Sequence, residues 1–311
     1  MHRTCSPTRR CGLRIWGSDC MKIQLLSDLH LEWLPDWVPP RLPQADVLVL
    51  AGDIGSYQRG SRLPVGEGVH PRDWALSRFS PRLGWPTPVF YVPGNHEYDA
   101  LDFESTHVQL RERCESLGIT WLHHESVLFN GVRFMGSTLW SDFDALAGSR
   151  VQAGEAVTPT QTLQWREKSY RAANFYLEKT ATVYHGGPML APQVREQALL
   201  CQQWLGAELA KPFDGKTVVV THFAPSVKSA DPRYGNAKHP GQPTPGTAGF
   251  CNALDGWFEH ADVWLHGHLH CPQDYRAGEH DSCRVVCNPL GYERKGEQEG
   301  FRPGLLIELA S

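Results

Sequence analysis

The segment Trp264-Leu265-His266-Gly267-His268-Leu269-His270 carries three alternating histidines directly after an apolar run. His268 and His270 are two residues apart, so on extended backbone their side chains would share a face. Gly267 allows the chain to turn sharply after the run. Imidazole is the commonest metal ligand in proteins but also a frequent surface group. This pair alone therefore leaves open both a metal site and a pair of hydrogen-bonded loop histidines.

Four earlier apolar runs end in side chains of similar chemistry. Carboxylate, amide and imidazole groups together are ligands for divalent transition metals. Taken one at a time, each acid or amide would be interpreted as a turn residue. His222 alone would be interpreted as a buried, hydrogen-bonded histidine. Their recurrence at five strand ends favours a metal site instead. The runs 23–26, 46–51, 89–92 and 217–220 lead, in order, to Asp28 and His30, to Gly52 and Asp53, to Gly94, Asn95, His96 and Glu97, and to His222.

The apolar runs predict the strands that must position these groups. They lack alternation, as is typical of strands buried on both faces. The dipeptide Asn130-Gly131 predicts a tight hairpin between two further strands. Helical patterns occupy residues 100–117, with Gly118 as a stop, and recur from Thr158-Pro159 to about Leu177 and from Pro192 to Leu209. The sequence thus predicts an α/β fold, with strands also at 284–287 and 305–308.

The composition indicates an ordinary globular protein. The chain has 311 residues, 41% of them hydrophobic, and its 30 basic and 34 acidic residues give a net charge of −4. This balance argues against a broad nucleic-acid-binding face. No apolar stretch is long enough to span a bilayer. Nine cysteines, an odd number, without a secretory signal predict reduced thiols and a cytoplasmic location.

The chain divides into three segments. Residues 1–20 contain arginines but no continuous apolar core, so we predict a poorly ordered N-terminal extension and not a secretory signal. An ordinary arm that packs against the domain is the alternative. Residues 21–311 are expected to form one domain. Within it, strand patterns disappear over 141–215, which we interpret as a helical insertion or cap over the site.

The chain resembles the calcineurin-like metallophosphoesterase superfamily in its ordered set of five motifs. These motifs are D-x-H, G-D, G-N-H-[DE], H and G-H-x-H. All five motifs are present over about residues 21–290, with 141–215 outside the resemblance. The resemblance implies a four-layer α/β/β/α sandwich of two mixed sheets flanked by helices. It also implies two divalent metal ions (Mn, Fe or Zn, with Mn favoured) that clamp a phosphoryl group. Cys287-Asn288-Pro289, followed by Gly291-Tyr292, is similar to an ending found in small bacterial members.

The resemblance also assigns roles residue by residue. Asp53 would bridge the two metals, and His96 would act on the phosphoryl group or the leaving oxygen without binding metal. Glu97 would orient a neighbouring group. The remaining ligands would be Asp28, His30 and His270 for the first metal, and Asn95, His222 and His268 for the second.

The resemblance implies hydrolysis of a small phosphoester, such as a phosphodiester or nucleotide, by a metal-activated hydroxide. Phosphoprotein phosphatases follow their Gly-Asp with a second acid and Arg-Gly, whereas this chain has Ile54-Gly55-Ser56-Tyr57, which argues against that activity. A nuclease using the same site is one alternative, although the net charge argues against nucleic acid as a partner. A non-catalytic metal-binding scaffold is another, which the intact motifs disfavour. The sequence does not fix the oligomeric state.

Other residues could line the substrate cleft. Trp33 and Trp37 follow the first motif and could form a wall or pack in the core. The long loop at 226–250 places Arg233, Tyr234, Lys238 and His239 between two motifs, where they could bind a substrate phosphate or remain solvated.

Overall fold

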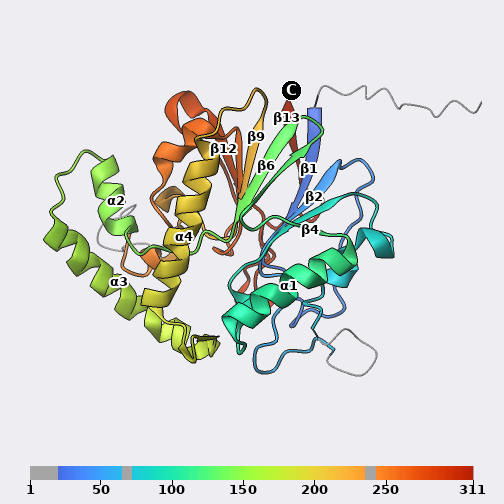
Figure 1. The fold of residues 1–311 in the computed structure, drawn as a ribbon, viewed down its shortest axis with the longest axis horizontal. Coiled ribbons are helices and arrows are strands. Elements are labelled where there is room, and N and C mark those ends of the chain that lie inside the picture. Colours follow the sequence, from blue (N-terminus) through green and yellow to red (C-terminus); the bar gives the residue numbers. More distant parts are fainter. Residues whose placement is uncertain (1–19, 65–71, 235–242, 311) are drawn as a thin grey trace, which may run out of the picture.

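The computed structural model describes residues 20–64, 72–234 and 243–310, and Figure 1 shows two β-sheets packed face to face with helices outside them. The first sheet has five strands in the order β13-β1-β2-β3-β4, and the second has six in the order β11-β12-β10-β9-β6-β5. Each combines parallel and antiparallel pairs, so the predicted four-layer sandwich of mixed sheets is confirmed. The strands are β1 (Cys20–Leu26), β2 (Val47–Ala51), β3 (Val89–Val92), β4 (Thr120–Trp121), β5 (Glu125–Phe129), β6 (Val132–Ser137), β9 (Thr217–Thr221), β10 (Val263–His266), β11 (Gln273–Ala277), β12 (Cys283–Cys287) and β13 (Leu306–Ala310).

The central strands are buried on both faces, as their unbroken apolar sequences predict. In β2, Val47, Val49 and Ala51 join the core between the two sheets. Leu48 and Leu50, on the opposite face, join the core beneath the outer helices. This alternation follows from the two-residue period of a strand. Each central strand therefore contributes to two hydrophobic layers, which holds its carboxyl end in a fixed position.

One helix covers each sheet. Helix α1 (Phe103–Leu117) packs beside β4, and α4 (Ala191–Leu209) packs against β6. Asp102 caps α1 by accepting the N–H of Ser105, and Gly118 ends it with a φ of 72°, as expected for this stop signal. Helix α4 buries Val194, Ala198, Cys201, Leu205 and Leu209 in the core beneath it. It is thus a structural layer of the sandwich.

The other elements of 141–215 stand off the sandwich (Figure 1). Helix α2 (Ala145–Gln152) and helix α3 (Pro159–Thr180) contact the short 3₁₀ helix Thr247–Gly249 of the long loop before β10. Helix α3 begins at the predicted Thr158-Pro159 with a capping box. Asp144 joins this region to α4, since its carboxylate accepts from Arg166 and from Arg195 at 2.8 and 2.9 Å. A cap function for 141–215 stays a prediction.

The structure corrects several predicted details. Strand β11 was not expected, because its sequence Gln-Asp-Tyr-Arg-Ala lacks an apolar run; it is an edge strand with only one neighbour. Strand β1 begins at Cys20, one residue before the predicted domain boundary, and residues 1–19 lie outside the described residues. Between α3 and α4 a small hairpin, β7 (Val183–Tyr184) with β8 (Gly187–Pro188), interrupts the helical segment. The Asn130-Gly131 hairpin is confirmed, with φ values of 48° and 79°.

Two expectations concern the environment of the chain. No helix in the described ranges is long and apolar enough to cross a membrane. The seven cysteines within these ranges are free, as expected for reduced thiols. The cytoplasmic location remains a prediction.

Candidate metal centre

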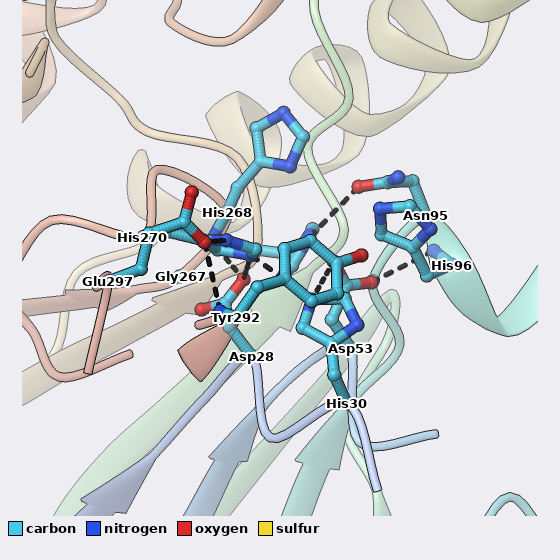
Figure 2. Close-up of polar contacts among 12 residues, drawn as sticks. Asp28, His30, Asp53, Asn95, His96, Gly267, His268, His270, Tyr292 and Glu297 are labelled. Carbon is cyan, nitrogen blue, oxygen red and sulfur yellow. Dashed lines mark hydrogen bonds and ion pairs between the residues drawn. The ribbon is translucent and has the colours of Figure 1, made fainter. Parts of the chain in front are cut away.

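The five motifs meet at one edge of the sandwich. Strands β1, β2 and β3 are mutually parallel, as are β9 and β10, so their carboxyl ends lie together. Backbone contacts tie these ends within each sheet: Asp28 N–H donates to Gly52 O at 3.0 Å, and Gly267 N–H donates to His222 O at 3.0 Å. His222 Nδ1 bonds Ala51 O at 2.8 Å. Figure 2 shows the motif side chains converging from these segments.

The backbone at the motifs is in an unusual conformation. Five predicted ligands have φ in the left-handed region, which non-glycine residues seldom adopt. Each such residue costs of order 1 kcal/mol or more, and such residues concentrate at functional sites, where surrounding contacts hold them. The residues are Asp28 (52°), His30 (44°), Asp53 (55°), His268 (73°) and His270 (46°).

The predicted ligands form two groups that share Asp53. One group contains Asp28, His30, Asp53 and His270, and the other contains Asp53, His222 and His268; within each, the candidate ligand atoms lie within 4.8 Å of one another. Oδ2 of Asp53 lies 3.2 Å from His222 Nε2 and 4.0 Å from His30 Nε2. The sequence prediction had placed Asp53 in this shared position.

The amide predicted for the second group lies beside it. Asn95 Oδ1 is 3.1 Å from His222 Nε2. In the first group, His270 Nε2 lies 3.5 Å from Asp28 Oδ1 and 3.1 Å from His30 Nε2. All seven predicted ligands are therefore gathered at the centre.

The chemistry of the centre fits two divalent cations. Three buried polar atoms of the predicted ligands make no hydrogen bond: Asp28 Oδ2, His268 Nε2 and Asp53 Oδ2, of which Asp53 Oδ2 has His222 Nε2 as an ion-pair neighbour at 3.2 Å. A buried polar atom without a partner is costly, and a cation would supply the missing interaction. Asp28 Oδ2 belongs to the first group, His268 Nε2 belongs to the second, and Asp53 Oδ2 belongs to the residue that both groups share. The donor set of carboxylate, amide and imidazole suits Mn, Fe or Zn.

Charge balance supports the same interpretation. Burial opposes ionisation of Asp53, but His222 and His96 outweigh it and hold the pKa of its carboxyl well below the usual value. Conversely, burial disfavours protonation of His222 and His270, but neighbouring carboxylates raise both pKa values to about 9. Burial lowers the pKa of His268. The carboxylates thus require positive charge close by, which cations would provide.

Two glutamates orient histidines of the first group, and the motifs had not indicated either of them. His30 Nδ1 bonds Glu32 Oε1 at 3.2 Å, and His270 Nδ1 bonds Glu297 Oε2 at 2.6 Å. A carboxylate on one ring nitrogen fixes the tautomer and turns the other nitrogen toward a metal. Glu32 continues the alternation of Asp28 and His30, a signal that could have found it. Glu297 is far in sequence from the motifs, and no sequence pattern indicated that it would contact His270.

His96 lies beside the two groups without joining either. Its backbone N–H donates to Asp53 Oδ1 at 2.9 Å, and its Nδ1 bonds Asp99 Oδ2 at 2.5 Å. Burial opposes protonation of the imidazole, but Asp99 and Asp53 raise its pKa well above the usual value. A histidine held in this way can donate a proton from Nε2. Asp99 was not predicted.

Glu97 holds the turns of two motifs together. Its carboxylate accepts the backbone N–H groups of Asp53, Ile54 and Gly94 at 3.2, 2.9 and 2.9 Å. Burial raises its pKa to about 8, although these donors favour the charged form. Gly94 must lack a side chain, because a Cβ there would lie 2.1 Å from Asp53 Oδ1. The predicted orienting role of Glu97 thus has a physical basis in these contacts.

We expect Glu97→Ala to lower the free energy of unfolding by roughly 3–5 kcal/mol, because it leaves three buried N–H groups unpaired. Urea denaturation of purified protein measures this loss. Glu97→Gln, which keeps an acceptor oxygen, is the matched control and should lose clearly less. Equal stability of the alanine variant and the parent protein would contradict this role.

A further group, formed by His123, His124 and Cys201, also brings possible ligand atoms within 4.8 Å. His123 Nδ1 accepts the backbone N–H of Thr138 at 3.0 Å, so in the neutral ring Nε2 carries the proton. The His124 ring stacks on Trp204. We therefore interpret His123 and His124 as packing residues.

The residues proposed for the substrate cleft have different surroundings. Trp37 packs against the core with Phe301. Arg233 is paired with Asp231 and lies 3.4 Å from His270 O. Lys238 and His239 lie outside the described residues.

Comparisons with known proteins show which family the chain resembles. The family model for calcineurin-like phosphoesterases matches residues 21–272. An uncharacterised protein of Acanthamoeba polyphaga mimivirus is 23% identical over 333 residues, covering 92% of this chain and 96% of its own. The crystal structure of a phosphopantetheinyl hydrolase from Mycobacterium tuberculosis matches 93% of this chain and 95% of its own, with a TM-score of 0.59 and 17% identity. A dimetal phosphatase from Danio rerio matches 86% of each chain at 15% identity and a TM-score of 0.44. Since the family model spans most of the chain, this protein belongs to the calcineurin-like phosphoesterase family.

Proposed function

We propose that this protein is a dinuclear metal-dependent phosphoesterase that hydrolyses a small phosphodiester or nucleotide. The observation that carries the proposal is the sharing of Asp53 between two groups of ligands, each with a buried polar atom that lacks a partner. Asp28, His30, Asp53 and His270 would hold one cation. Asp53, Asn95, His222 and His268 would hold the other.

Two cations at such a site supply an activated water and neutralise charge on the phosphoryl oxygens. The chain's own residues complete the chemistry. Protonated His96 would donate from Nε2 to the phosphoryl group or to the leaving oxygen, while Asp99 holds Nδ1. Glu32 and Glu297 would keep His30 and His270 turned toward the cation. No nucleophilic side chain is required, so no covalent phosphoenzyme is expected.

The test is hydrolysis of bis(p-nitrophenyl) phosphate and of p-nitrophenyl phosphate by metal-stripped protein, before and after Mn²⁺ is added back. We expect turnover of the diester only when metal is present. Turnover of the monoester alone would contradict the preference for diesters. Absence of turnover of both esters, in protein shown by elemental analysis to hold two metal ions, would contradict catalysis and support a scaffold role.

A further inference from the structure

Tyr292 forms one wall of the proposed centre. Its ring stacks on His30, with centroids 4.3 Å apart, and meets His270 edge-on at 5.0 Å. Its backbone N–H donates to Glu297 Oε2 at 2.9 Å, the same oxygen that His270 Nδ1 bonds. Figure 2 shows the Tyr292 ring at the centre, on the side where it stacks on His30. Tyr292 is therefore fixed by the residues that orient the proposed ligands.

Arg294 lies against this wall. Its guanidinium carbon is 5.4 Å from the centre of the Tyr292 ring and 5.8 Å from that of the Trp33 ring. Trp33 is held in turn by Arg62, whose guanidinium donates to the Trp33 carbonyl. Both distances fall within the range of a cation–π contact. Two aromatic side chains thus position one guanidinium at the rim of the centre.

The charge of Arg294 is not compensated in the part of the chain that the structure describes. Its neighbour Lys295 lies 3.6 Å from Glu297 Oε1, and Arg233, also near the centre, is paired with Asp231. Among the described residues Arg294 has no ion pair or hydrogen bond; its guanidinium lies near the two rings and the residue is exposed. A guanidinium that lies against aromatic rings and has no ion-pair partner can still offer its N–H groups, whose planar fork matches the oxygens of a phosphate or carboxylate.

We propose that Arg294, supported by Trp33 and Tyr292, binds a second anionic group of the substrate. This inference rests on the proposed function, because it places the scissile phosphoester at the metal centre. The Tyr292 ring contacts Arg294 as well as His30 and His270, so the second anion would lie close to the scissile group. The substrate class is a phosphoester that carries a further phosphate or similar oxyanion, either in a small molecule or as the next phosphate of a nucleic acid strand.

The test compares two chromogenic esters that differ by one phosphate: the p-nitrophenyl ester of thymidine 5′-phosphate, and the same ester with a 3′-phosphate. For the Mn²⁺-loaded protein we expect kcat/KM to be about tenfold or more higher with the 3′-phosphate, the usual effect of a charge-assisted hydrogen bond. Arg294→Ala should remove this preference. Arg294→Lys, which keeps the charge without the planar fork, should retain part of it.

Arg302→Ala is the matched control, because Arg302 is an exposed arginine of the same C-terminal segment that pairs with Asp274. The Arg302→Ala protein should keep the preference of the parent protein for the 3′-phosphate ester. If Arg302→Ala also loses this preference, the inference is overturned, because general surface charge would then explain the preference. An unchanged preference in Arg294→Ala would also overturn it. Hydrolysis of both esters without any preference would reject this subsite and leave the proposed function standing, whereas hydrolysis of neither would reject the proposed function. Cleavage of oligothymidylate with the same dependence on Arg294 would support the subsite and identify a strand as the source of the second phosphate.

Discussion

Asp53→Asn is expected to abolish phosphoester hydrolysis, with kcat falling by a thousandfold or more (on the order of the contribution of a metal pair). Asp53 is the one residue shared by both groups of candidate ligands, and its Oδ2 lies between His30 and His222. An amide cannot supply the negative charge that bridges two cations. The purified variant should also hold fewer than two metal ions per chain, as measured by elemental analysis.

The control for this experiment is Asp142→Asn. Asp142 is also buried, but it accepts hydrogen bonds from Gln202 and from the backbone of Asp144, away from the motifs. Both of these donors are uncharged amide groups, so an amide should be tolerated at position 142. This control should retain activity and metal content. An Asp53→Asn protein with two metals and normal turnover would show that Asp53 does not bridge.

The second large effect is expected at His96. His96→Asn should lower kcat by about a hundredfold to ten-thousandfold, the usual contribution of a general acid, while the two metal ions stay bound. The reason is position: His96 contacts Asp53 through its backbone and Asp99 through its ring, but it joins neither group of ligands. Steady-state kinetics and metal analysis on the same preparation separate this role from metal binding.

Asp99→Asn tests the support of His96. The amide can still accept a hydrogen bond from Nδ1 but no longer favours the protonated ring, so kcat should fall less than in His96→Asn. The double variant should be no slower than His96→Asn alone, because Asp99 would act only through His96. Additive losses in the double variant would indicate that Asp99 acts independently.

The sequence by itself predicted an α/β fold and placed the candidate ligands at strand ends, whereas the two-sheet sandwich and the ligand set came from the family resemblance. Unbroken apolar runs such as 46–51 are typical of strands buried on both faces, and the residues that follow these short runs lie at the strand ends. Because strands β1, β2 and β3 are parallel, these ends had to meet. Strand β11 escaped prediction because an edge strand needs less apolar surface and its sequence shows none of the buried pattern.

Only the tertiary structure decided what surrounds these residues. Glu297 reaches His270 across 26 intervening residues, and Tyr292 stacks on His30 from the opposite end of the chain. Asp99 lies near His96 in sequence, but the turn at residues 96–98 is what brings its carboxylate onto the imidazole. Contacts between side chains from separate segments depend on how the two sheets and their loops pack. The local pattern of apolar and polar residues does not determine that packing. It does predict where each strand ends.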